Sequence, residues 1–381
     1  MAKIINFATK YLKRTAIFLV LVLFLCPIKI TAANANSSVF EIQANNARYS
    51  FCEAEIATVN GIKTLKCIDD VIDGIYLDTV IHPVDASVTY NVESCSFDIT
   101  SDKTGLEINK NELKSEVIKA LNSNVKKVTA KLYTTLPALT KTEAESLTNM
   151  RSRFTTYYSN SIENRKHNIL VAVNKLNGIK IEPYSEFSFN QTVGARTEEN
   201  GFKMAKIILN GEFIDGVGGG VCQVSTTLYN SALLSGLKIT EHHSHSLEVS
   251  YVEPSFDAMV NSYSSDLKFK NETPYPMFIV AKADGNALSI AIYGKKQVER
   301  YERVSVITGE ITPTTIETEE DATLLKGQTV EVRKAKNGIK SEGYLIVYNG
   351  ETRVKNVKIR TDSYKAINQK ILVGTAEQKA E

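Results

Sequence analysis

The chain has 381 residues, of which 43% are hydrophobic and 23% are charged. This length suggests two or three domains, and the composition is that of folded protein, so a disulfide-stapled miniprotein and a disordered tail are both excluded. The net charge is +2, but the first 35 residues hold five basic residues and no acid, which leaves the remainder at −3. We expect no nucleic-acid partner, because phosphate binding needs a clustered surplus of positive charge.

The N-terminus has the pattern of an export signal. Basic residues up to Arg14 precede an apolar run from Ala16 to Ile28, and small residues follow up to Ala35. This run is short for a membrane-spanning helix but has the length of the apolar region of a secretory signal. We therefore expect a signal peptide over residues 1–35 and a protein on the extracellular side of the membrane, secreted or associated with the cell wall. The alternative is an uncleaved signal anchor, which would then be the protein's contact with the membrane.

The cysteines that follow the signal divide into a group and an outlier. Cys52, Cys67 and Cys95 lie in the N-terminal third, and in an oxidising compartment this favours one disulfide among them, although the sequence does not choose the pair. Cys222 stands far from the others. An unpaired thiol outside the cytoplasm is a liability unless it is buried or used, so Cys222 is a candidate for a functional role.

Residues 36–150 predict a small α+β module. Alternating runs at Ser87–Val92 and Val128–Tyr133 are typical of strands, and apolar residues at every fourth position predict a helix over Glu112–Leu121 with Asn111 as its cap. A second helix is expected near Glu143–Met150, capped by Thr142.

Residues 151–297 predict a central mixed α/β domain, and residues 298–381 predict an all-β module. The central part has a periodic helix at Ile169–Leu176 closed by Gly178, a strand start at Phe187, a glycine-rich turn, a helix and several alternating strands. The C-terminal part is rich in Thr, Val, Lys and Gly, with alternating runs typical of strands. The fold class is therefore α+β with several domains.

The glycine-rich turn is the most informative feature. Gly218, Gly219 and Gly220 allow left-handed backbone and close approach, and the apolar spacing that follows predicts a helix ended by Gly236. Cys222 would then lie at the helix N-terminus. There the free N–H groups and the positive end of the dipole favour a thiolate and stabilise an oxyanion that forms beside the sulfur.

A base for this thiol is expected from Glu241–Tyr251, interpreted as a strand. The two-residue alternation of a strand directs His245, and His243 if the pairing extends so far, toward the helix that carries Cys222. Asp257, beyond the next turn, is the candidate acid that orients the histidine.

Three interpretations of Cys222 remain open from the residues alone. The thiol is the nucleophile of acyl transfer or hydrolysis, or it is a small buried packing residue, or it binds a metal together with His243 and His245. A lone cysteine is commonly a buried packing residue, so we carry catalysis forward as a hypothesis, and we expect no metal and no cofactor.

Further candidates surround the thiol. We assign Gln223 and Ser225, together with the three glycines, to substrate binding. Arg165 and Arg196 are candidates for binding a substrate carboxylate, and Asp266 is expected to cap a turn or a strand end.

Several of these segments together resemble the VanW family over roughly residues 153–294. The matching segments are Asn164-Arg165, Phe187–Asn190, Gly218–Asn230, His245-Ser246, Asp257-Ala258 and Asp266–Asn271. The flanks resemble modules that accompany this family: residues 83–121 are similar to a peptidoglycan-binding domain, and residues 304–375 are similar to a G5 domain. The sequence departs from the family pattern at His242, where an arginine is common, and at Pro183–Glu186.

The resemblance implies an exported Gram-positive cell-envelope protein, linked through the family to glycopeptide resistance. We expect it to act at peptidoglycan or its stem peptides, with Cys222 as nucleophile, His245 as base and Asp257 as orienting acid. The alternative is a non-catalytic peptidoglycan-binding scaffold in which Cys222 is structural.

Overall fold

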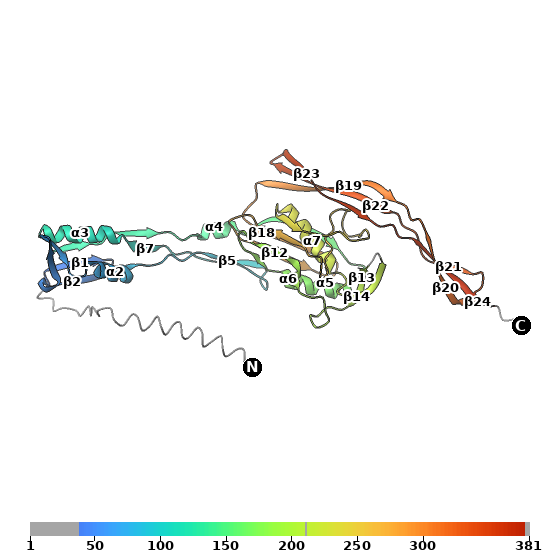
Figure 1. Cartoon of the computed structure of the whole chain (residues 1–381), viewed down its shortest axis with the longest axis horizontal. Coiled ribbons are helices and arrows are strands. Elements are labelled where there is room, and N and C mark those ends of the chain that lie inside the picture. Colours follow the sequence, from blue (N-terminus) through green and yellow to red (C-terminus); the bar gives the residue numbers. More distant parts are fainter. Residues whose placement is uncertain (1–37, 210–211, 378–381) are drawn as a thin grey trace. The chain divides into compact units, whose positions relative to one another are not determined.

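The computed structural model describes residues 38–209 and 212–377, so the expected signal peptide lies outside the described residues. The described residues form two compact units (Figure 1). Unit 1 comprises residues 38–84 and 103–137, and unit 2 comprises residues 85–102 and 138–377. Because each unit takes two segments of sequence, the chain passes between them three times, after Val84, Asp102 and Pro137. Within the described residues, no helix has the length and apolar character to cross a membrane.

Unit 1 is a small α+β fold. Its helices are α2 (Ile68–Thr79) and α3 (Lys110–Asn122), preceded by the short 3₁₀ turn η1 (Glu53–Glu55). Its strands are β1 (Phe40–Ala44), β2 (Ala47–Phe51), β3 (Ile56–Val59), β4 (Ile62–Leu65), β7 (Gly105–Ile108), β8 (Lys127–Thr129) and β9 (Leu132–Thr135). A three-stranded sheet has the order β2-β1-β8, and β3–β4 and β7–β9 form antiparallel pairs.

The predicted helix of unit 1 is confirmed, but its cap is not. Leu113, Val117 and Leu121 of α3 are buried against the sheet, as their fourfold spacing predicts. The cap is Asn109 rather than Asn111, because the Asn109 side chain accepts the N–H of Glu112. The run predicted as one strand at residues 128–133 is instead divided between β8 and β9, which pair with different partners.

The expected disulfide is not formed. All four cysteines of the described residues are free, and three of them lie in separate turns. Cys52 precedes η1, Cys67 precedes α2 with a φ of 50°, and Cys95 has a φ of 53° in another turn. Each of these cysteines thus occupies a local turn position of its own.

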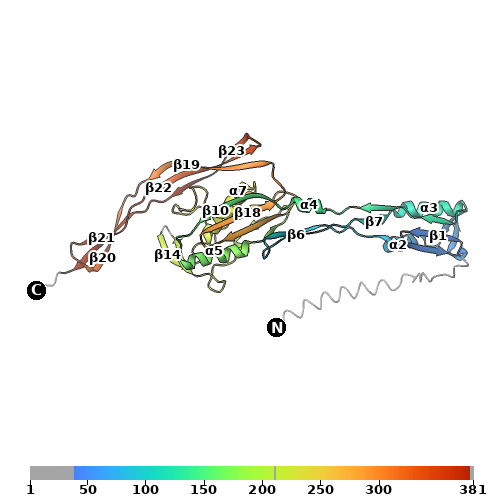
Figure 2. The ribbon, with the colours of Figure 1, turned by 180° about the vertical axis from the view of Figure 1, so that it is seen from behind.

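Unit 2 is built around a four-stranded antiparallel sheet of order β10-β18-β17-β11. These strands are β10 (Asn149–Tyr157), β11 (Lys180–Ile181), β17 (Met277–Ala283) and β18 (Ala287–Gly294). Helices α5 (Glu163–Leu176) and α7 (Val221–Leu234) contact one face of this sheet and each other (Figure 2). Apolar residues of both helices share one core with Ile279, Ile290 and Ile292.

The opposite face of this sheet is partly covered by a hairpin from the earlier part of the sequence. The hairpin consists of β5 (Ser87–Asn91) and β6 (Ser96–Thr100), and it packs with α4 (Lys141–Ser146) around Phe278. The strand predicted near residues 87–92 is confirmed as β5. The helix predicted near 143–150 is shorter and starts earlier, because Thr140 and Glu143 form a capping box and β10 begins at Asn149.

Smaller elements complete the central part of unit 2. They are β12 (Glu186–Ser188), α6 (Phe189–Val193), β13 (Met204–Leu209), β14 (Glu212–Val217), β15 (Lys238–Glu241) and β16 (Lys268–Lys270). Strands β12, β16 and β15 form a second sheet, and β13–β14 form a hairpin that leads into the glycine-rich turn.

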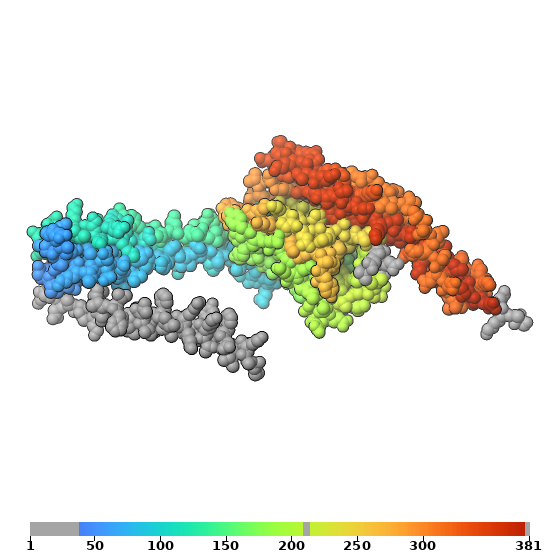
Figure 3. Space-filling model, in the orientation of Figure 1, coloured from blue at the N-terminus to red at the C-terminus, as the bar shows by residue number. Residues whose placement is uncertain are grey.

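The C-terminal part is all β, as predicted. Its strands are β19 (Glu299–Ile311), β20 (Ile316–Leu325), β21 (Thr329–Arg333), β22 (Gly338–Asn349), β23 (Thr352–Tyr364) and β24 (Gln369–Ala376). They form two three-stranded sheets, β19-β22-β23 and β20-β24-β21. In the space-filling view part of the orange and red region, the β19-β22-β23 sheet, lies against the yellow part of unit 2 (Figure 3).

Two glycines of unit 1, one in α2 and one in the β3–β4 turn, test how the backbone conformation at each position affects stability. Both Gly74 and Gly61 have open space where a Cβ would lie, but Gly61 has a φ of +81°. We expect Gly74→Ala to stabilise α2 by about 0.5–1 kcal/mol, since alanine loses less backbone entropy on folding than glycine does. We expect Gly61→Ala to destabilise by about 1–2 kcal/mol, since left-handed backbone is unfavourable for alanine. Calorimetric unfolding of the full chain should show shifts of opposite sign, and shifts of the same sign would contradict this account.

Candidate active site

The glycine-rich turn sets the start of α7. Gly218 and Gly220 have φ angles of +91° and +109°, and a Cβ on Gly219 would lie 2.5 Å from the backbone oxygen of Lys206. The buried Asn168 side chain of α5 fixes the turn by donating to the carbonyl of Gly219 at 3.0 Å. The turn therefore requires glycine, and α7 begins at Val221, as predicted, with Gly236 (φ +69°) beyond its end.

Cys222 is the second residue of α7 and is partly exposed. Its Sγ lies 3.3 Å from the carbonyl oxygen of Val260. Within the described residues, the backbone N–H of Cys222 has no hydrogen-bond acceptor, as is usual in the first turn of a helix. Burial would raise the pKa of the thiol, but hydrogen bonding and charge from His245, together with the charge of Arg196, lower it. The thiol is thus disposed to ionise beside a free N–H donor.

His245 connects this thiol to a buried acid. Its Nδ1 lies 2.7 Å from Oδ2 of Asp257, and its backbone N–H donates to the same oxygen at 2.7 Å. Both side chains are almost fully buried. Burial would lower the pKa of His245, but hydrogen bonds to Asp257 and Cys222 raise it to about 9. Because Nδ1 is occupied, Nε2 is left for the thiol, and the three residues predicted as nucleophile, base and orienting acid lie together.

The backbone that presents His245 differs from the prediction. Strand β15 ends at Glu241, and residues 242–267 are irregular, so the expected strand over 241–251 is wrong. The loop is held instead by polar side chains of α7. The Ser225 hydroxyl donates to the carbonyl of Ala258 at 2.6 Å, and the Thr226 hydroxyl accepts the backbone N–H of Ala258 at 2.9 Å. The Asn230 side chain donates to the carbonyl of Phe256 at 2.8 Å. These bonds replace a sheet ladder and fix the position of Asp257.

The other histidines of this segment lie elsewhere. His243 Nε2 lies 3.0 Å from the Glu241 carboxylate, which also pairs with Lys268. The ring of His242 stacks on Tyr229, with centroids 5.6 Å apart. The structure therefore joins His245, and not His243, to Cys222. In residues 38–209 and 212–377 no group of three or more His, Cys, Asp or Glu side chains is arranged to hold a metal ion.

The residues assigned to substrate binding have different surroundings. Ser225 is fully buried in its bonds to the loop, and Gln223 is buried beneath Arg165. The Gln223 amide nitrogen bonds to Thr156 and to the carbonyl of Tyr157, while its oxygen accepts from Arg165 at 2.8 Å. Both side chains thus have partners within the protein.

Two arginines lie close enough to influence the thiol. Arg165 bonds to Ser161 and Gln223, and Arg196 bonds to Asn190 and the carbonyl of Gly194. Among the ion pairs of the described residues, neither guanidinium has a carboxylate partner. Burial lowers the pKa of both, and the negative charge of an ionised Cys222 opposes this effect. They are half-buried cations beside the thiol that lack a paired anion.

Asp266 has the structural role that was predicted. Its carboxylate accepts from the Ser188 hydroxyl at 2.5 Å and from the backbone N–H of Asn190 at 2.9 Å. These bonds join the start of α6 to the end of the loop, so Asp266 orders the backbone near Arg196.

Three further residues surround the triad, and no sequence pattern marks them. Tyr251, expected only as an apolar position of a strand, lies near Cys222 and Asp257, and its burial together with their charges raises its pKa. Arg360 and Tyr364 of β23 contact Asp257 directly. About a hundred residues separate them from Asp257, and no local pattern marks such a contact.

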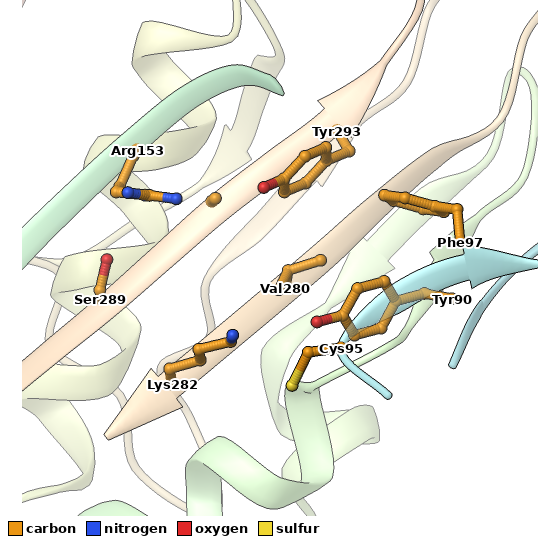
Figure 4. Close-up of a pocket in the computed structure, with 9 residues that line it drawn as sticks. Tyr90, Cys95, Phe97, Arg153, Val280, Lys282, Ser289 and Tyr293 are labelled. Atoms are coloured by element: carbon orange, nitrogen blue, oxygen red, sulfur yellow. The ribbon is translucent and has the colours of Figure 1, made fainter. Parts of the chain in front are cut away.

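A second concave surface lies on the other face of the β10-β18-β17 sheet. It is a pocket of about 520 Å³ between that face and the β5–β6 hairpin (Figure 4). Its lining is aromatic and basic, from Tyr90, Phe97, Tyr293, Arg153 and Lys282, with the Cys95 thiol at one side. None of the triad residues lines it.

Three family models match the chain. They are "Putative peptidoglycan binding domain" over residues 65–130, "VanW like protein" over residues 164–293 and "G5 domain" over residues 303–376. The order is the one expected from the sequence.

Two curated relatives and a solved structure also match. YoaR of Bacillus subtilis (strain 168), an uncharacterized protein, is 40% identical over 146 residues, which are 38% of this chain and 48% of YoaR. The vancomycin B-type resistance protein VanW of Enterococcus faecalis (strain ATCC 700802 / V583) is 27% identical over 177 residues, 45% of this chain and 63% of that protein. The matched region thus spans less than two thirds of each relative. The match to the IgA1 protease G5 domain structure is 20% identical and covers 20% of this chain and 90% of the chain of that structure. Its TM-score of 0.16 is too low to support a statement about the fold.

The fold and the site define a multidomain α+β protein with a Cys–His–Asp arrangement at a helix N-terminus and an all-β C-terminal region. The matches are more specific: residues 164–293 match the VanW family model, and both curated relatives match part of the chain. Its peptidoglycan-binding and G5 domain matches support association with the cell wall.

The lowered pKa of Cys222 gives a prediction for alkylation. The thiolate is the reacting form, so the alkylation rate rises with pH through a midpoint that we expect to lie below the value of about 8.5 for a free cysteine. His245→Asn removes the cation that stabilises the thiolate. The midpoint should rise toward the ordinary value, and the rate at pH 7 should fall severalfold. The measurement is iodoacetamide labelling from pH 5 to 10, followed by mass spectrometry of the peptide that carries Cys222.

The matched control for this experiment is His243→Asn, two residues away in the same loop. It should leave the midpoint unchanged, because His243 pairs with Glu241. Equal midpoints in the parent and His245→Asn, or a larger shift from His243→Asn, would contradict the assignment of His245.

Proposed function

We propose that this protein acts on peptidoglycan stem peptides by Cys222-dependent acyl transfer or hydrolysis. The proposal rests on one observation above all, the His245 imidazole bonded to the buried Asp257 and interacting with a thiol at the start of α7. An arrangement of this kind activates a nucleophile and orients its base. A thiol that served only for packing would need none of these partners.

The chemical steps balance without a cofactor. The Cys222 thiolate attacks a peptide carbonyl carbon, and the oxyanion is stabilised by the free backbone N–H of Cys222 at the start of α7. The C–N bond then breaks as the protonated His245 gives its proton to the leaving amine, which leaves a thioester on Cys222. An acceptor amine or water attacks the thioester, His245 takes up its proton, and the thiolate is released.

The unpaired arginines favour a substrate that carries a carboxylate near the bond that reacts. Arg165 and Arg196 are half-buried, lie near the thiol and lack a carboxylate partner within the described residues. A guanidinium binds a carboxylate through paired hydrogen bonds, so these two side chains would orient a peptide with a free acid group. Gln223 acts in this arrangement as the support of Arg165.

The flanking modules are proposed to hold the protein at the wall. We place a peptidoglycan-binding module within residues 36–150, the VanW domain at 151–297 and a G5-like module at 298–381. The export signal predicted for residues 1–35 would deliver these domains outside the cytoplasm. Resistance to glycopeptides is part of this proposal because one relative is named a vancomycin resistance protein.

A comparison of three proteins tests the catalytic proposal. The parent should bind purified peptidoglycan and release or exchange stem-peptide fragments, whereas Cys222→Ser and Cys222→Ala should bind equally and lose product formation by at least about a hundredfold. Products are measured by mass spectrometry and binding by sedimentation. Cys95→Ser, which removes an exposed thiol, is the control and should retain activity.

The non-catalytic scaffold predicts a different result. In that case the parent and both Cys222 variants would bind alike and none would change the peptidoglycan. This outcome would remove the catalytic assignment and leave a wall-binding protein with a structural cysteine.

The role of the arginines has a test that needs no wall substrate. The measured quantity is the ratio of two rates of Cys222 alkylation, that with anionic iodoacetate divided by that with neutral iodoacetamide. This ratio should be higher in the parent than in Arg196→Met or Arg165→Met. We expect this ratio to fall about fivefold, which corresponds to about 1 kcal/mol of charge attraction. Because both reagents use the same thiolate, a change of thiol pKa cancels in the ratio.

Lys166→Met is the matched control for the arginine variants. Lys166 lies beside Arg165 on α5 and pairs with Glu163 at the surface, so its removal should leave the ratio unchanged. A ratio that is insensitive to both arginine variants would contradict carboxylate binding at this site.

A further inference from the structure

The C-terminal strands have few buried side chains, and several of these are polar. Most residues of β19–β24 are exposed or half-exposed, as expected for thin sheets without a large core. Tyr364 is 1% exposed, Ser341 is fully buried, and Arg360 is 8% exposed although it carries a charge. A buried arginine needs strong partners, so these positions deserve an explanation beyond the stability of the sheet.

Two of these side chains hold Asp257. The Tyr364 hydroxyl donates to Oδ1 of Asp257 at 2.6 Å, and Arg360 donates to the Asp257 carbonyl oxygen at 2.6 Å. A second guanidinium nitrogen of Arg360 lies 3.5 Å from Oδ1. The carboxylate therefore has β23 on its Oδ1 side and His245 on its Oδ2 side.

The same strands hold a strained residue nearby. Ser255 has a φ of +63°, which is unfavourable for a residue with a Cβ, and it precedes Asp257 by two positions. The Tyr364 hydroxyl oxygen accepts the backbone N–H of Ser255 at 2.8 Å. The hydroxyl groups of Ser255 and Ser341 bond to each other at 2.7 Å. At Gly343 a Cβ would lie 2.9 Å from the Ser255 carbonyl oxygen, so β22 also approaches this residue closely. Such a conformation persists only where the surroundings fix it.

We infer that β22 and β23 of the C-terminal module are part of the active site, where Tyr364 and Arg360 position Asp257 so that its Oδ2 faces His245. This inference rests on the proposed function of the triad. Neither residue meets the reacting atoms, so both act as positioning residues through Asp257. The module would thus take part in the chemistry as well as in binding to the wall.

The chemistry of these side chains suits this role. Burial and the charge of Asp257 raise the pKa of Tyr364, so its hydroxyl remains protonated and donates. Arg360 is anchored by Asp362, whose carboxylate accepts from it at 2.6 and 2.8 Å. The titratable and charged groups around Asp257 come from the loop, α7 and β23; they are His242, His245, Tyr251, Cys222, Tyr229, Arg360, Asp362 and Tyr364.

The test measures the thiol and not the wall product. In the full chain, Tyr364→Phe and Arg360→Met should shift the midpoint of Cys222 alkylation to higher pH, because a carboxylate free to turn holds the imidazolium less well. At pH 7 the alkylation rate should fall about threefold, the change produced by half a pKa unit. Arg360→Lys keeps the charge and should recover part of the rate. Thermal unfolding of each variant shows whether it remains folded, and Tyr364→Phe, which keeps the ring, is the variant expected to fold best.

Matched controls come from the same sheet. Tyr344→Phe removes a hydroxyl that bonds to Glu342, and Arg353→Met removes an exposed arginine of β23; neither should move the midpoint. Suppose that the parent thiol is activated and that Tyr364→Phe and Arg360→Met are folded. If their alkylation midpoints equal that of the parent, the positioning role is overturned and the proposed function is not. A parent in which Cys222 reacts like an ordinary cysteine would overturn the proposed function itself.

Discussion

The site depends on an ionised carboxylate kept away from water. Burying the Asp257 charge is costly unless every oxygen finds a donor, and burial alone would raise the pKa of this group. His245, Arg360 and Tyr364 reverse that effect and hold the pKa of Asp257 below its ordinary value. Because the charge is stabilised in place, it can stabilise an imidazolium, and the imidazolium can stabilise a thiolate at the start of α7.

Helix α7 serves this arrangement with two different groups of residues. Val224, Leu228 and Ala232 join the hydrophobic core, while Ser225, Thr226 and Asn230 bond to the backbone of the loop that carries Asp257. Polar residues buried in a helix are unfavourable unless their bonds are satisfied, and here they are satisfied by an irregular segment that has no sheet partner. One helix thereby supplies both the nucleophile and the support for the acid.

Local features of the fold could be predicted from the sequence, and contacts between distant segments could not. The glycine turn and the position of Cys222 follow from backbone sterics and helical spacing, which act over a few residues. Strand alternation predicts His245 as the base. The structure pairs it with Asp257 although the segment is a loop, because side chains of α7 replace the strand pairing. Arg360 and Tyr364 contact Asp257 only because β23 packs beside the loop that carries it. Alternation along a strand predicts which side chains are buried, but it does not predict which distant residues they contact.

The interleaved connection between the units bears on how the chain responds to cleavage. Since the backbone passes between unit 1 and unit 2 after Val84, Asp102 and Pro137, one cut at any of these points leaves two covalent links intact. The segment before Val84 also shares the core of unit 1 with α3, so the fragments would stay associated by hydrophobic packing. The chain would therefore tolerate a single break after any one of these three residues without losing either unit.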